Sequence, residues 1–162
     1  MPRRIVAVTL GCLGALALSS ARAQTATQVV TFEVRPINRV AVSGAPSPLV
    51  VNSAVAGQAP TSASAVGGTY AVTTNEANKK ITASVDQALP SGVSLEVQLG
   101  APTGASTAGS VALSTSASDV VTGISSLSAS ALPITYRLNA SQSVLISAPQ
   151  TRTVTFTIVS GT

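Results

Sequence analysis

The sequence of 162 residues contains no histidine and no tryptophan, and its one cysteine, Cys12, and one methionine, Met1, lie near the N-terminus. Zinc, copper and haem sites are built largely from histidine and cysteine, and the common pairs of nucleophile and general base need one of the two. We therefore expect no cofactor and no metal. Because no second cysteine is present, an internal disulfide is also excluded.

Five carboxylates remain for acid–base chemistry, and they are Glu33, Glu76, Asp86, Glu96 and Asp119. They are scattered, without the D-x-D spacing that builds an oxygen cage for calcium. Folding could bring two of them together to hydrolyse a glycoside, but no neighbouring residue types would tune their pKa values. We predict a protein that is not an enzyme, with paired-carboxylate catalysis as a remote alternative.

The first 23 residues have the three parts of a secretory signal peptide. Arg3 and Arg4 form a basic head, residues 5–18 are an apolar run, and the small residues Ala21 and Ala23 flank a cleavage point. The run is shorter than the roughly 20 apolar residues that cross a membrane. We therefore expect export and cleavage, and no stable membrane insertion of the mature protein.

Cleavage would divide the chain into a signal peptide, residues 1–23, and one domain, residues 24–162. Three of the nine basic residues leave with the signal peptide, so six remain against five acidic residues and the net charge falls from +4 to +1. Nucleic-acid binding needs a clustered basic face, and only Lys79 and Lys80 are adjacent in the mature chain. We expect no nucleic-acid partner, and a location in the periplasm, on the cell surface or in the medium.

Valine, threonine and serine are abundant after residue 23, and apolar residues recur at every second position along most of the chain. This period is that of strands with one buried face. Residues 93–99 show it most clearly, with Val97 inward and Glu96 outward, after turn residues at 89–92. About eight or nine short strands in one domain predict an all-β fold, a single antiparallel β-sandwich of immunoglobulin-like type. A small closed barrel is the alternative.

Two segments near the two ends of the chain share almost one pattern, VTFEV over residues 30–34 and VTFTI over residues 154–158. Alternation places their apolar side chains on one face of each strand, and these are Val30, Phe32, Val34, Val154, Phe156 and Ile158. The first and last strands of an immunoglobulin-like sandwich often lie side by side. We therefore expect residues 30–34 to complete the sheet beside residues 154–158, with both phenylalanines in one core layer.

The same pairing could form between two copies of the chain. Pro36 separates the first strand from the rest of the domain, so residues 30–34 could leave their own sandwich and add to the sheet edge of a neighbour. Exchange of an identical element without closed symmetry generates a filament. The six apolar residues of the two segments are therefore our candidates for strand pairing or self-association.

The signal peptide, the short alternating N-terminal strand and the terminal TVTFTIV resemble those of secreted bacterial immunoglobulin-like surface proteins, including pilus subunits that polymerise by donor-strand exchange. Many such subunits carry a cysteine pair near the N-terminal strand and a tyrosine close to the C-terminus, and residues 24–162 have neither. The resemblance implies a structural protein of the envelope or of a fibre. The alternative is a small adhesin or glycan-binding module that uses the loops predicted over residues 53–68 and 100–110.

Overall fold

The computed structural model describes residues 24–144 and 148–161, and the signal peptide predicted for residues 1–23 lies outside them. The chain divides into two units, residues 1–33 and residues 34–162. The described part of the first unit contains no strand, and all strands lie in the second. They are β1 (Asn38–Ser43), β2 (Ala63–Thr74), β3 (Lys79–Val85), β4 (Val93–Leu99), β5 (Ser106–Thr107), β6 (Val111–Ala112), β7 (Ser118–Ile124), β8 (Leu127–Ala140) and β9 (Val154–Ser160).

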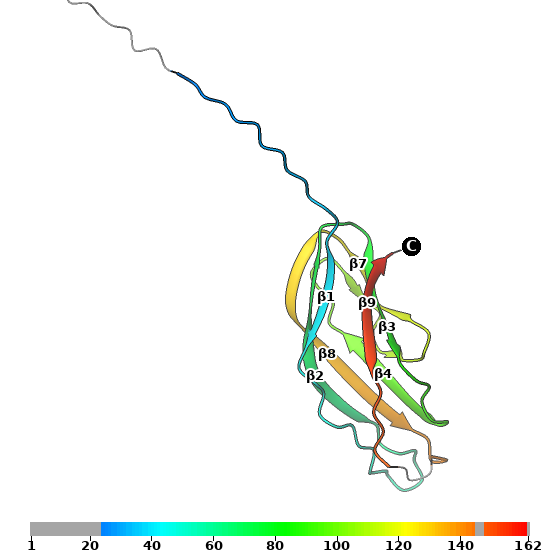
Figure 1. Ribbon diagram of the computed structural model, residues 1–162. Coiled ribbons are helices and arrows are strands. Elements are labelled where there is room, and N and C mark those ends of the chain that lie inside the picture. The colour runs from blue at the N-terminus through cyan, green and yellow to red at the C-terminus, as the bar shows by residue number, and fades with distance from the viewer. Residues whose placement is uncertain (1–23, 145–147, 162) are drawn as a thin grey trace, which may run out of the picture. The chain divides into compact units, whose positions relative to one another are not determined.

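The strands form two antiparallel sheets (Figure 1). One is five-stranded with the order β1-β2-β8-β4-β6, and the other is four-stranded with the order β5-β7-β3-β9. No helix able to cross a membrane occurs among residues 24–144 and 148–161. The predicted all-β antiparallel sandwich is confirmed, and the closed barrel is wrong because each sheet ends in two edge strands.

Both sheets contribute to one core, as the period-two alternation requires. From the five-stranded sheet the buried apolar side chains are Tyr70, Val72, Val97, Leu99, Ile134 and Tyr136. From the four-stranded sheet they are Ile81, Ala83, Val85, Val120, Val121 and Ile124. The predicted register of β4 is confirmed, since Val97 is fully buried while Glu96 keeps partial exposure.

The strand expected over residues 30–34 does not form within the single chain. Val30 is 71% exposed, Phe32 86% and Val34 77%, so none of the three is a core residue. The first strand of the structure is β1, and it pairs with β2, beginning at Asn38 opposite Thr74, so the β9 edge is left unpaired among the described residues. The intramolecular prediction was therefore wrong, whereas pairing between copies stays a prediction.

Candidate functional site

The four sheet edges differ in length. β5 and β6 are two residues each, whereas β1 has six and β9 has seven. Very short edge strands protect a sheet from pairing with another chain, so one edge of each sheet is blunted. The long edges, β1 and β9, contact each other across the two sheets (Figure 1).

β9 is paired on one side only. It pairs with β3 along its whole length, from Val154 opposite Val85 to Ser160 opposite Lys79. No strand in the described part of the chain pairs with its other side. Alternate N–H and C=O groups of β9 therefore point away from β3, where they can accept another strand.

A groove of about 580 Å³ lies between the two long edges. Its lining residues are Pro36, Ile37, Asn38, Arg39, Val40 and Ala41 from the β1 side and Phe156, Thr157 and Ile158 from β9. Val40, Phe156 and Ile158 each pack on the core and keep part of their surface exposed. The groove therefore has apolar patches beside an unpaired strand edge, and Asn38, Arg39 and Thr157 add polar groups to its lining.

The predicted site residues divide between the groove and the segment before β1. Phe156 and Ile158 line the groove, and Val154 begins the same strand. Val30, Phe32 and Val34 are exposed and form no strand. The alternation at Val40 and Val42 could be seen in the sequence, but nothing local indicated that β1 would form the opposite wall.

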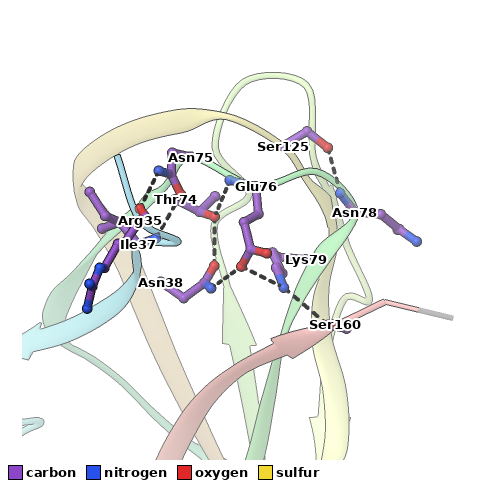
Figure 2. A network of polar contacts seen from close by, with 10 residues as sticks. All are labelled: Arg35, Ile37, Asn38, Thr74, Asn75, Glu76, Asn78, Lys79, Ser125 and Ser160. Atoms are coloured by element: carbon purple, nitrogen blue, oxygen red, sulfur yellow. Dashed lines mark hydrogen bonds and ion pairs between the residues drawn. The ribbon is translucent and has the colours of Figure 1, made fainter. Parts of the chain in front are cut away.

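A polar cluster lies where β1 begins and β9 ends (Figure 2). The Asn38 amide donates to Glu76 Oε2 and accepts from Thr74 Oγ1 at 2.7 Å. Lys79 Nζ lies 3.0 Å from the same Glu76 oxygen and donates to Ser160 Oγ at 3.1 Å. Glu76 and Lys79 thus link the first residue of β1 to the last residue of β9, one from each sheet.

These partners stabilise the charged form of the Glu76 carboxylate. The hydrogen bond from Asn38, and then that from Lys79, lower the pKa of Glu76 below its ordinary value of 4.5. Both donors favour the charged form. The ionised carboxylate therefore holds the cluster together at neutral pH.

Asn75 fixes the chain just before β1 (Figure 2). Its side-chain oxygen accepts from the Ile37 N–H at 2.7 Å, and its side-chain nitrogen donates to the Arg35 carbonyl at 2.9 Å. Its backbone N–H donates to the Ile37 carbonyl at 3.2 Å. Asn75 was not among the predicted site residues, because an asparagine between two strands has many ordinary explanations.

The other described carboxylates have structural partners. Asp119 pairs with Lys80 at 3.0 Å, and Asp86 accepts from the Thr153 N–H at 3.0 Å. Glu96 accepts from Ser110 Oγ at 2.6 Å and from the Asn139 amide at 3.1 Å. Within residues 24–144 and 148–161 there is no group of three histidine, cysteine or acidic residues that could hold a metal ion.

The two loops predicted for a glycan-binding module are shorter than expected. Residues 63–68 belong to β2, and residues 106–107 form β5. The loop before β2 therefore ends at residue 62. Neither protein-family models nor curated proteins match this chain, so the groove between β1 and β9 and the segment before β1 are the basis for inferring function.

Proposed function

We propose that this protein is a self-associating subunit of an extracellular or cell-surface fibre, in which residues 28–34 of one copy occupy the groove between β1 and β9 of another. The proposal rests on one observation: the same chain contains both an open strand edge and an exposed segment that could pair with such an edge. β9 offers an unpaired edge beside apolar surface, and residues 28–34 offer an exposed segment with alternating apolar side chains.

The two halves match in length and chemistry. Residues 28–34 are as long as β9, and a strand of that length can pair with it throughout. Val30, Phe32 and Val34 would then face the partly exposed Val40, Phe156 and Ile158 of the receiving copy. Burying each such side chain contributes on the order of 1.5–3 kcal/mol, before the cost of ordering the segment.

Such a contact is heterologous, because each copy gives one segment and receives another. A heterologous contact that does not close into a ring generates a filament. The blunted edges at β5 and β6 favour growth through the β1 and β9 edges alone. Threonines 155 and 157 are exposed on β9, which suits a polymer surrounded by water outside the cell.

Two variants of the mature protein, residues 24–162, test the donated segment and the receiving groove one at a time. Phe32→Asp places a charge where burial is required, and Ile158→Lys places one in the groove wall. We expect the parent protein to form ladders or filaments in light scattering and negative-stain microscopy, and each variant to be monomeric. The matched control Thr31→Asp, on the opposite face of the segment, should still assemble.

Mixing the two variants is the decisive step. The Phe32→Asp copy keeps an intact groove and the Ile158→Lys copy keeps an intact segment, so a one-to-one mixture should form dimers. These should unfold at a higher temperature than either monomer, because binding stabilises the folded state. A parent protein that stays monomeric at high concentration, or a mixture without dimers, contradicts the proposal. A monomer retained on a glycan array would favour the adhesin alternative.

A further inference from the structure

Asn75 extends the ladder between β1 and β2 beyond the last pair of strand residues. That pair is Asn38 opposite Thr74, so the next position of β1, Ile37, lies opposite Asn75. The Asn75 backbone bonds the Ile37 carbonyl, and its side-chain amide serves as a further peptide group for the Ile37 N–H and the Arg35 carbonyl. Residues 35 and 37 therefore present their polar groups to one side, as alternate residues of a strand do.

Pro36 favours the same extended path. The residue before a proline is restricted to extended backbone conformations, which holds Arg35 in line with β1. In a loop over residues 35–37, Pro36 would take the third position (i+2) of a type I turn, where proline is disfavoured. Pro36 and the hydrogen bonds of the Asn75 side chain therefore both favour an extended backbone over residues 35–37.

This path decides whether the segment can fill the groove of its own chain. A segment folded back into that groove would run antiparallel to β1. A three-residue loop over residues 35–37 would place Phe32 opposite Val40 and Val30 opposite Val42. Those pairs put apolar side chains together, since Val40 lines the groove and packs on the core.

With residues 35–37 held by Asn75, the loop has to form before Arg35. A three-residue loop over residues 32–34 takes Phe32 and Val34 out of the strand. It also places Gln28 opposite Asn38 and Ala26 opposite Val40, so no large apolar side chain of the segment lies opposite Val40. A one-chain closure is therefore unfavourable in this register.

We infer that Asn75 is a positioning residue that blocks self-occupation of the groove and so directs residues 28–34 to a second copy of the chain. The inference rests on the proposed function, because it concerns the choice between the chain's own groove and that of a neighbour. Asn75 would then control the ratio of two forms, a monomer whose groove holds its own segment and an assembly of several copies, although it lies outside the apolar contact.

The test compares a matched pair of mature proteins that differ at Asn75 alone. Both carry Pro36→Gly, which removes the proline restriction on a loop, and one also carries Asn75→Ala. We expect the Asn75→Ala member to shift the ratio of monomer to assembly toward monomer by about tenfold or more. A change of that size follows from the loss of two ordinary hydrogen bonds that oppose the loop.

Hydrogen exchange of the monomer fraction locates the segment. Residues 28–34 should become protected in the monomer that carries both Pro36→Gly and Asn75→Ala. They should stay unprotected in the monomer that carries Pro36→Gly alone. Asn75→Asp should act in the same direction, because a carboxylate cannot donate to the Arg35 carbonyl. Circular dichroism and cooperative unfolding check that every variant folds.

The outcomes separate this inference from the proposed function. If the parent assembles and the Asn75 variants assemble equally, with residues 28–34 unprotected in their monomers, the inference is overturned and the proposed function stands. If the parent is monomeric with residues 28–34 already protected, both are overturned. If the parent is monomeric with those residues unprotected, the proposed function fails. The directing role of Asn75 then fails with it, and the exchange comparison decides only whether Asn75 blocks self-occupation of the groove: a rise in the protection of residues 28–34 on removing Asn75 supports this, and an absent rise overturns it.

Discussion

Tyr70 is a fully buried side chain whose polar end is satisfied. Its ring is 1% exposed, and its hydroxyl donates to the Gly100 carbonyl at 2.5 Å. Burial raises the pKa of Tyr70 from 10.0 to about 12, because the phenolate would be desolvated in the core. The neutral tyrosine is therefore part of what stabilises the sandwich.

This shift predicts a loss of stability at alkaline pH. A folded-state pKa above the unfolded value gives a contribution that is fully present below pH 10 and is lost as the pH rises toward 12. We expect Tyr70→Phe to lower the free energy of unfolding at pH 9 by about 0.5–1.5 kcal/mol, through the missing hydrogen bond. Urea titrations between about pH 9 and pH 12 should show a smaller further loss in the variant than in the parent. Equal losses would contradict this role for Tyr70.

The register of β4 gives a second prediction at this scale. Leu99 is fully buried, so Leu99→Ala should lower the free energy of unfolding by about 2–5 kcal/mol. Leu95→Ala should cost less, because Leu95 keeps partial exposure. Glu96→Ala removes only partly exposed hydrogen bonds and should cost about 1 kcal/mol or less. Urea unfolding in which the Glu96 variant is the least stable of the three would show that the faces of β4 are reversed.

Among the elements, β1 and β9 are the two that meet as long edges from different sheets. The polar cluster of Asn38, Glu76, Lys79 and Ser160 links their ends. This link sets the separation of the groove walls at one end, so the cluster matters for the shape of the groove that an added strand would enter. Its stability depends on the charge of Glu76.

Acidification should therefore weaken the link. Because the folded-state pKa of Glu76 is lowered, its contribution is present above the ordinary value of 4.5 and is lost as the pH falls through the folded value. We expect the thermal unfolding midpoint of the parent to fall more between about pH 7 and pH 3 than that of Glu76→Gln, which cannot lose a charge. Identical falls in the two proteins would show that Glu76 does not act through its ionised form.

At the scale of the whole molecule, the described residues leave one long edge of each sheet unpaired and one apolar segment exposed. An open edge and exposed apolar side chains are both aggregation hazards. Addition of residues 28–34 to the β9 edge of another copy would cover both at once, so each added subunit would remove one exposed segment and one exposed groove. The assembled form is then expected to be the stable one, and the free monomer its precursor.

Much of the fold follows from the sequence by itself. The period-two alternation defines which faces of β4 and β9 are apolar, because side chains of a strand point to opposite sides whatever its partner is. The same alternation, with turn residues between the segments, predicted an all-β antiparallel sandwich. Val97 was correctly predicted as inward for this reason.

Only the tertiary structure decided which strands are neighbours. Residues 30–34 have as regular an alternation as residues 154–158, yet they form no strand, and the first strand of the sheet is β1. The groove needs residues that are far apart in the sequence, Val40 and Phe156 among them, and Asn75 bonds Arg35 and Ile37, which are also distant from it in the sequence. Alternation is a property of neighbouring residues, whereas an open edge depends on which distant strands have already taken the other positions in the sheet.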